Sequence, residues 1–322
     1  MKELRPLGRT GIRVTPIGLG LWQFSKRANL AGKFWPELAD DETDAIVRAA
    51  LDGGVNWFDT AEIYGKGRSE EALARGLSKA GKRDGDVVIA TKWWPTFRRA
   101  GNIRKTIGER IGRLGGFSID LHQVHHPASL SSVRAQMDAM ADLVSQEKIR
   151  AVGVSNFGAR RMRAAHAALA KRGLPLAANQ VKMSLLCRKP EQSGVLAAAK
   201  ELGITVIAYS PLAQGLLSGR FHDDPALVKR SPGFRRFLPS FRRKGLARSR
   251  PVVEALRAIA AAHGATPSQV ALAWLVAFHG DTVVAIPGAT KPGQASECAA
   301  AMTIELTPAE LVRLDEVSRA FV

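Results

Sequence analysis

The runs N-W-F-D-T-A (56–61), S-E-E-A-L-A-R-G-L-S-K-A (69–80) and V-V-I-A-T-K (87–92) contain the pattern that decides the fold. The first and third runs are short and rich in β-branched or aromatic residues, which is typical of strands. The run between them has apolar residues at helical spacing. A strand, a helix and a second strand in this order form one β-α-β unit, in which the two strands are parallel.

The same alternation continues along almost the whole chain. Eight β-α units without a break in composition predict an α/β protein, a single (β/α)₈ TIM barrel domain over residues 1–322. The expected strands are 14–19, 56–61, 87–92, 119–125, 149–155, 176–181, 205–210 and 282–287. The expected helices between them are 41–53, 69–80, 102–114, 131–147, 157–172, 190–202, 251–263 and 291–302.

A barrel of this kind needs about 250 residues, so the remainder of the chain requires an explanation. It consists of a stretch before Val14, a long loop at 212–250 after the seventh strand, an inserted helix at 267–279 and a C-terminal helix at 308–320. A doubly wound open sheet is the competing architecture. It would carry a Gly-rich fingerprint after its first strand, and G-L-G-L-W (18–22) has the wrong spacing.

Composition excludes several classes of protein. The chain is 46% hydrophobic and 24% charged, which is ordinary for a globular protein and unlike a disordered one. Its apolar runs are too short to cross a bilayer, and no export signal follows the first residues, so we expect a soluble, cytoplasmic protein with no membrane partner. Only Cys187 and Cys298 are present, which excludes a disulfide framework or a cysteine-rich zinc site.

The chain carries 47 Lys and Arg against 29 Asp and Glu, a formal net charge of +18. Residues 228–250 hold nine of these cations and no acid, with three Phe and two Pro between them. The composition of this segment is typical of one loop. Three interpretations stay open: a solvated basic loop, a lid over an anionic ligand, or an arm for nucleic acid, although no specific nucleic-acid partner is expected.

Chemically active side chains lie where three successive strands end. In a (β/α)₈ barrel the reacting groups come from the C-terminal ends of the strands and from the loops that follow them. These groups would therefore meet on one rim. They are Asp59 and Tyr64 in F-D-T-A-E-I-Y-G (58–65), Lys92 in I-A-T-K-W-W-P (89–95) and His125 in D-L-H-Q-V-H-H-P (120–127).

These four residues fit proton donation to a developing alkoxide. A phenol with a pKa of about 10 is a weak acid at neutral pH, and a neighbouring cation such as Lys92 makes its proton easier to release. Asp59 is the counterion that a buried ammonium needs. A neutral His125 would hold the carbonyl oxygen by hydrogen bonding.

The histidines at 122, 125 and 126 also suggest a metal site. Side chains alternate across a strand, so His122 and His126 share one face and His125 points to the other. Only one set can enter the barrel, and no further histidine follows a neighbouring strand. We therefore predict no metal.

With these motifs in place, the sequence resembles the aldo-keto reductases, NADPH-dependent carbonyl reductases on a (β/α)₈ barrel. The resemblance runs from G-R-T-G-I-R-V-T-P-I-G-L-G (8–20) to the C-terminal helix. It implies that Tyr64 is the general acid, Lys92 the partner that lowers its pKa, Asp59 the partner of Lys92, and His125 the group that orients the carbonyl.

The resemblance also implies where NADPH or NADP⁺ binds. Ser155, Asn156 and Gln180 would bind the nicotinamide carboxamide, and Tyr209 would stack on its ring. The pyrophosphate path would be lined by Ser210, Leu212, Gly215 and Leu216. Further cofactor contacts are expected from Gly20, Leu21, Trp22, Ile286 and Gly288.

The segment I-P-G-A-T-K-P-G-Q-A-S-E-C (286–298) resembles the adenosine clamp of the family. Thr290 and Lys291 would meet the 2′-phosphate and favour NADPH over NADH. Gln294 and Glu297 would hold the adenine with position 298. There the family usually has Asn and this chain has Cys298; Leu21 similarly stands where Thr is common, and His126 replaces an aromatic or acidic residue.

Given the resemblance, the basic segment is better interpreted as a cofactor lid. Trp22, Trp93 and Trp94 would form an apolar pocket for a small-molecule carbonyl substrate, an aromatic or medium-length aldehyde or ketone. Arg98 and Arg99 nearby would suit an anionic carbonyl. The alternative function is a redox-sensing regulatory or binding subunit that retains the reductase fold; the oligomeric state does not follow from the sequence.

Overall fold

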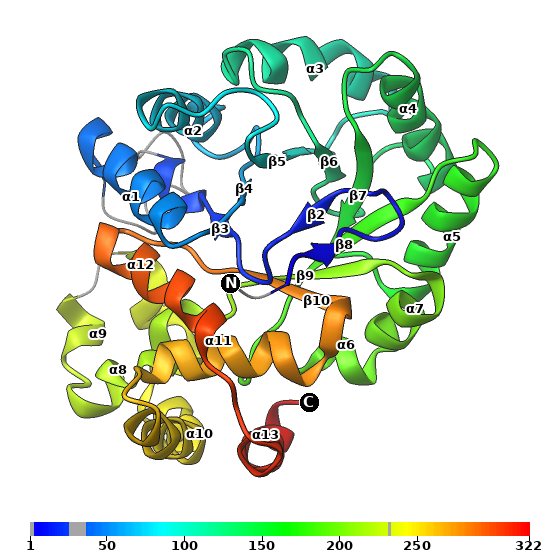
Figure 1. Ribbon diagram of the computed structural model, residues 1–322. Helices are drawn as coiled ribbons and strands as arrows, with labels where there is room; N and C mark the ends of the chain where they lie inside the picture. The colour runs from blue at the N-terminus through cyan, green and yellow to red at the C-terminus, as the bar shows by residue number, and fades with distance from the viewer. Residues whose placement is uncertain (1–2, 26–36, 231–232) are drawn as a thin grey trace.

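Eight parallel strands are present as predicted, but the first, expected at 14–19, is shorter and begins only at Leu19, while Val14 belongs to a separate hairpin. The computed structural model describes residues 3–25, 37–230 and 233–322, and within them one sheet of eight parallel strands follows chain order. The confirmed fold class is thus a (β/α)₈ barrel (Figure 1). The strands are β3 (Leu19–Gly20), β4 (Trp57–Asp59), β5 (Val88–Trp93), β6 (Leu121–Val124), β7 (Ala151–Ser155), β8 (Leu176–Lys182), β9 (Thr205–Tyr209) and β10 (Val283–Ile286).

The barrel closes where its first and last strands meet. Parallel bridges join Ile17 to Ala285 and Gly20 to Gly288. The backbone N–H of Gly18 donates to the carbonyl of Ala285 at 2.9 Å, and the N–H of Ala285 donates to the carbonyl of Pro16 at the same distance. The C-terminal ends of all eight strands therefore surround one opening.

Helices form a ring outside the strands (Figure 1). Two helices, α10 (Arg243–Ala262) and α13 (Pro308–Ser318), pack on each other outside this ring. The ring consists of α1 (Asp40–Asp52), α2 (Arg68–Lys79), α3 (Gly101–Arg113), α4 (Val133–Ser145), α5 (Ala159–Ala170), the pair α6 (Lys189–Gln192) and α7 (Val195–Leu202), α11 (Pro267–Phe278) and α12 (Pro292–Ala300). The roles predicted for 251–263 and 267–279 are therefore exchanged: the first belongs to α10, outside the ring, and the second is α11, which lies in the ring and packs on β10.

The stretch before Val14 is an antiparallel hairpin of β1 (Arg5–Pro6) and β2 (Arg13–Val14), which lies across the middle of the ring in Figure 1. Its Leu7, Ile12 and Val14 are buried with the side chains that fill the barrel interior. The chain turns at Gly8, whose φ is +59° and where a Cβ would lie 2.5 Å from the carbonyl oxygen of Ala177. The hairpin therefore closes the N-terminal end of the barrel.

Most predicted helices agree with the observed ones within one or two residues at each end, and two differ by more. The run 190–202 is divided into α6 and α7 because Gly194 takes a left-handed φ of 73° between them. The helix expected at 251–263 begins eight residues earlier, at Arg243, and Pro251 lies inside it. Leu246 and Ser249 of this early part are buried, so tertiary packing extends the helix past a residue that lacks a backbone donor.

The segment 212–250 is consequently not a plain loop. It contains η3 (Ala213–Ser218), α8 (Arg220–Asp223), α9 (Leu227–Arg230), η4 (Gly233–Phe237), η5 (Pro239–Phe241) and the start of α10. Leu216, Phe221, Val228, Phe241 and Leu246 bury one another in a small apolar cluster of their own. Among the helices of the described residues, none is long and apolar enough to span a bilayer.

Candidate active site

A cavity of about 930 Å³ opens at the C-terminal ends of the strands. Asp59, Tyr64 and His125 line one part of it, and Lys92 lies directly behind them, fully buried. Strands β4, β5 and β6 supply these residues or end next to them. The four residues that the sequence predicted to converge are therefore neighbours in space.

Lys92 and Asp59 form a buried ion pair in the barrel interior. The Lys92 ammonium donates to Asp59 Oδ1 and to the carbonyl oxygen of Thr60, the latter at 2.8 Å. Asp59 Oδ2 accepts from Gln123 Nε2 at 3.1 Å and from Gln180 Nε2 at 2.8 Å. Both carboxylate oxygens are therefore hydrogen-bonded, as a buried charge requires.

Tyr64 lies against this ion pair, with Lys92 Nζ 5.0 Å from the centre of its ring. Burial raises the pKa of Tyr64, while the charge and hydrogen bonding of Lys92 lower it in part. Burial opposes the charge on Lys92, but Asp59 and Tyr64 outweigh burial and raise the pKa of Lys92. At neutral pH the site thus holds a protonated phenol beside a charged ammonium.

His125 faces Tyr64 edge to face, with the ring centres 5.7 Å apart. Burial, aided by the charges of Lys92 and His126, lowers the pKa of His125 well below its ordinary value. The ring is therefore neutral at pH 7 and carries a single N–H. Asn156 Nδ2 donates to the backbone carbonyl of His125 at 3.2 Å, which ties the histidine to the end of β7.

Residues predicted to bind the nicotinamide carboxamide are already linked to one another. Tyr209 Oη donates to Asn156 Oδ1 at 3.0 Å, and Ser155 Oγ donates to the backbone carbonyl of Gln180 at 2.9 Å. The side-chain amide of Gln180 donates to Asp59. This end of the cavity is thus joined to the buried ion pair through Gln180.

The opposite part of the cavity contains the predicted adenosine residues Thr290, Lys291, Gln294, Glu297 and Cys298. Gln294 Oε1 accepts from the backbone N–H of Thr290 at 2.8 Å, and Glu297 Oε1 accepts from Thr266 Oγ1 at 2.5 Å. Burial raises the pKa of Cys298 to about 12, so its sulfur is a neutral thiol. It cannot offer the strong hydrogen bonds of the Asn side chain that is usual there.

The model for the aldo/keto reductase family matches residues 16–319. The chain belongs to that family. An oxidoreductase of Mycobacterium tuberculosis (strain ATCC 25618 / H37Rv), itself uncharacterized, is 40% identical over 309 residues, which cover 96% of this chain and 91% of that protein. Aldo-keto reductase str7 of Strobilurus tenacellus is 32% identical over 311 residues, covering 95% and 89%.

Two solved structures of the family are similar over nearly their whole length. The thermostable aldo-keto reductase Tm1743, crystallised with the inhibitor epalrestat, has a TM-score of 0.77 and 30% identity, covering 98% of this chain and 100% of its own. The glycerol dehydrogenase AKR11B4 from Gluconobacter oxydans has a TM-score of 0.85 and 27% identity, covering 99% and 96%. Like them, this chain is an oxidoreductase of the aldo/keto reductase family.

Most of the residues that the family resemblance assigned to the cofactor line the cavity. They are Gly20, Leu21, Trp22, Ser155, Asn156, Gln180, Tyr209, Ser210, Leu212, Gly215, Ile286, Gly288, Thr290, Lys291, Gln294, Glu297 and Cys298. Leu216 is the exception: its side chain is 2% exposed and packs in the apolar cluster with Phe221 and Phe241, outside the set of residues that line the cavity.

The prediction that Trp93 forms a pocket wall was wrong. Consecutive side chains of a strand point to opposite faces, and Lys92 points into the barrel, so Trp93 points outward to the helices. Its indole is buried in the main core and donates to Asn102 Oδ1 at 2.9 Å. Trp22 and Trp94 do line the cavity. Arg98, which was suggested for an anionic carbonyl, binds Glu62 and does not line the cavity.

Sequence reasoning missed several residues of the site. Gln123 is fully buried and binds Asp59, yet a glutamine within a strand gives no signal of its own. Three arginines of the segment 212–250 also line the cavity: Arg220, Arg230 and Arg235. Burial, with Arg220 nearby, lowers the pKa of Arg235 to about 10. The sequence shows that arginines are abundant in this part of the chain, but it does not show which of them point into the cavity.

The cavity wall contains strained backbone. Asn156, Ser210 and Gln214 line the cavity and have positive φ values between 52° and 61°, although none is glycine. Such residues cost about 1–3 kcal/mol each and cluster at binding sites. By contrast, no group of three or more His, Cys, Asp and Glu side chains able to hold a metal occurs in residues 3–25, 37–230 and 233–322.

Replacing Asp59 tests the buried ion pair. Asp59→Asn leaves the fully buried Lys92 without its counterion, so the free energy of unfolding should fall by about 3–5 kcal/mol. Urea unfolding at neutral pH, followed by circular dichroism, measures this loss. Asp142→Asn is the control, because Asp142 forms exposed pairs with Arg104 and Arg172 that are worth about 1 kcal/mol or less. Equal losses would contradict a dominant role for the Asp59 pair.

Proposed function

We propose that the protein is an NADP(H)-dependent reductase of aldehydes and ketones, with Tyr64 as general acid. The observation that carries this proposal is the cluster of Tyr64, a buried Lys92–Asp59 ion pair and a neutral His125 at one end of a large cavity. Membership of the aldo/keto reductase family supports it, since the family model matches nearly the whole chain.

Tyr64 acts as proton donor in this proposal. The phenol stays protonated at neutral pH because burial raises its pKa. As negative charge develops on the carbonyl oxygen, the Lys92 ammonium stabilises the phenolate that forms when Tyr64 gives up its proton. Asp59 keeps Lys92 charged and holds it in place. Donation by a positioned acid contributes about 10²–10⁴ in rate.

His125 orients the substrate. A neutral imidazole has one N–H to donate and adds no second positive charge beside Lys92. The apolar walls Trp22, Ile63 and Trp94 surround this end of the cavity and exclude water from the reacting carbonyl. Because Arg98 is bound to Glu62, these walls favour an uncharged aromatic or medium-length aldehyde or ketone over an anionic one.

The other part of the cavity fits a nicotinamide dinucleotide phosphate. Bound there, NADPH would supply the hydride that reduces the carbonyl carbon. Lys291 precedes the N-terminus of α12, where the helix dipole favours an anion. Arg220 and Arg235 add fixed positive charge to the same cavity. This charge supports a phosphorylated cofactor and a preference for NADPH over NADH.

Tyr64→Phe tests the general acid. The variant keeps the ring and loses the proton, so carbonyl reduction should fall by about 10² or more while NADPH binds as before. Turnover of 4-nitrobenzaldehyde and fluorescence titration with NADPH measure the two effects. The proposed role is wrong if both properties are lost together, or if neither changes.

The pH dependence of turnover follows from the pKa shifts. Tyr64 is protonated below its raised pKa and His125 is neutral above its lowered pKa, so neither changes charge between about pH 6 and about pH 8. We expect a flat profile of kcat for carbonyl reduction in this range and a decrease on the alkaline side only. A decrease on the acid side with a midpoint near about 6.5 would mean that His125 titrates normally.

The lid interpretation predicts which arginines matter. Replacing the cavity residues Arg220 and Arg235 by Ser should weaken NADPH binding about tenfold or more and reduce its dependence on salt. Replacing the exposed Arg236, Arg242 and Arg243 by Ser is the matched control and should leave both properties unchanged. Titrations at two salt concentrations measure them. Equal weakening by the exposed set would contradict the assignment of the lid to cavity-facing cations.

A further inference from the structure

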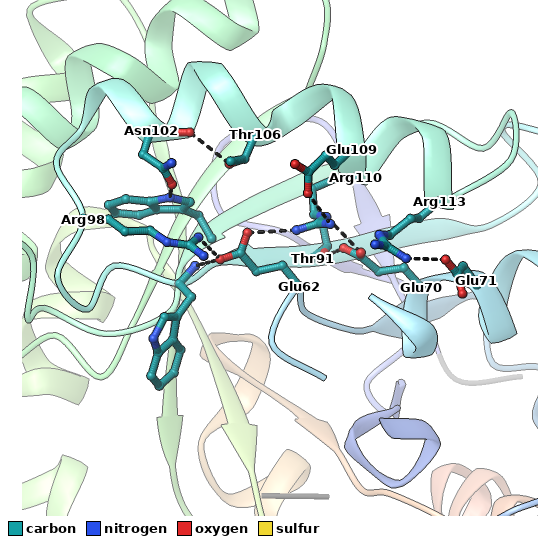
Figure 2. A network of polar contacts seen from close by, with 12 residues as sticks. Glu62, Glu70, Glu71, Thr91, Arg98, Asn102, Thr106, Glu109, Arg110 and Arg113 are labelled. Carbon is teal, nitrogen blue, oxygen red and sulfur yellow. Dashed lines mark hydrogen bonds and ion pairs between the residues drawn. The ribbon is translucent and has the colours of Figure 1, made fainter. Parts of the chain in front are cut away.

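Glu62 lies within the segment F-D-T-A-E-I-Y-G, three residues after Asp59 and two before Tyr64. Its carboxylate does not face the cavity. It points away from the barrel toward α3, where it is 6% exposed and surrounded by polar groups (Figure 2). The proposed reaction gives this buried charge no role.

The Glu62 carboxylate joins three parts of the chain (Figure 2). Its Oε1 accepts from the backbone N–H of Trp94 at 2.8 Å and from the guanidinium of Arg98, both in the loop after β5. Its Oε2 accepts from Arg110 Nη1 of α3 at 2.9 Å. One side chain in the loop after β4 thus holds the neighbouring loop in place.

Arg110 is itself held in place by a second carboxylate. It is 5% exposed, and its Nε lies 2.9 Å from Oε2 of Glu70, whose Oε1 accepts from Thr91 Oγ1 at 2.6 Å. Burial raises the pKa of Glu70 to about 7, and the charge of Glu62 contributes to this rise. If Glu62 lost its charge, Glu70 would ionise more readily and remain the counterion of Arg110. The network therefore tolerates neutralisation of Glu62 without leaving a buried arginine unpaired.

The group held by Glu62 is part of the cavity wall. The Trp94 ring lines the cavity and meets His125 edge to face, with the ring centres 5.2 Å apart. Its neighbour Trp93 is fixed in the core on the opposite side of the strand. Since the backbone N–H of Trp94 is bonded to Glu62, the carboxylate sets how far this indole stands from His125 and from Tyr64.

We propose that Glu62 is a positioning residue, whose buried carboxylate fixes Trp94 and thereby determines the shape of the carbonyl end of the cavity. The effect of Glu62 on substrate kinetics rests on the proposed carbonyl reduction, whereas its effect on the position of Trp94 does not. Trp94 contacts the substrate in this scheme; Glu62 acts only through Trp94.

The first experiment does not require turnover. The backbone amide of Trp94 is observed by NMR after ¹⁵N-tryptophan labelling, which gives signals from the six tryptophans, and is assigned with Trp94→Phe. In Glu62→Gln its hydrogen exchange should be about tenfold faster or more, because the charge-assisted bond is lost. Glu71→Gln is the matched control: Glu71 pairs with Arg113 in the same region but binds no part of the Trp94 loop. Unchanged exchange in Glu62→Gln would overturn the proposal.

The second experiment measures kcat and KM for 4-nitrobenzaldehyde and for the small propionaldehyde. Glu62→Gln should lower kcat/KM for the aromatic aldehyde about tenfold, mainly through KM, and change the ratio between the two substrates, while NADPH affinity stays within about twofold. In a Trp94→Ala background, Glu62→Gln should add less than about twofold, because both substitutions act on the same wall. An equal effect in both backgrounds would show that Glu62 acts elsewhere, and would overturn the proposal.

The two experiments separate the possible failures. If the wild-type protein reduces neither aldehyde, the proposed function is wrong, and amide exchange alone decides whether Glu62 holds Trp94. If Glu62→Gln does not fold, Arg98→Gln replaces it, since Arg98 is 38% exposed and its loss weakens the same carboxylate from the solvent side. A smaller change in the same direction is then expected, and no change would contradict the inference.

Discussion

The structure of the site depends on keeping one ammonium group charged inside the barrel. Lys92 is fully buried, and removing an ion of its size from water costs several kcal/mol unless its partners are well placed. Asp59 and the carbonyl of Thr60 meet this requirement directly, and Gln123 and Gln180 satisfy the second oxygen of Asp59. Residues of strands β4, β5, β6 and β8 are thus joined by the hydrogen bonds that hold the charge of Lys92. Such a pair contributes little net stability, which argues that the barrel retains it for chemistry.

Much of this arrangement could be predicted from the sequence because barrel strands obey simple rules. Short β-branched runs separated by helical runs predicted all eight strands, and the strand ends predicted the rim on which Asp59, Tyr64 and His125 meet. The error at Trp93 came from neglecting the same rule of alternation that places Lys92 inside. Applied to both residues, that rule would have assigned Trp93 to the helix layer from the start.

Other features depend on contacts between distant segments and leave no local signal. Burial of Leu246 and Ser249 extends α10 to the N-terminal side of Pro251, a residue that the sequence alone would place at a helix start. The composition of 228–250 shows a surplus of cations but not that Arg235 is buried while Arg236 is exposed. The partners of Glu62 lie 32 to 48 residues away along the chain, so only the folded barrel reveals them.

The hairpin that seals the barrel floor has a consequence for synthesis on the ribosome. Arg5 donates to the carbonyls of Gly280 and Val283, the N–H of Gly8 binds the hydroxyl of Thr205, and Pro16 accepts from Ala285. These partners lie 197 to 278 residues later in the chain, so they are synthesised well after the hairpin. Until β10 has been synthesised, the edge of the sheet that pairs with it stays open, and an open sheet edge favours aggregation of a nascent chain.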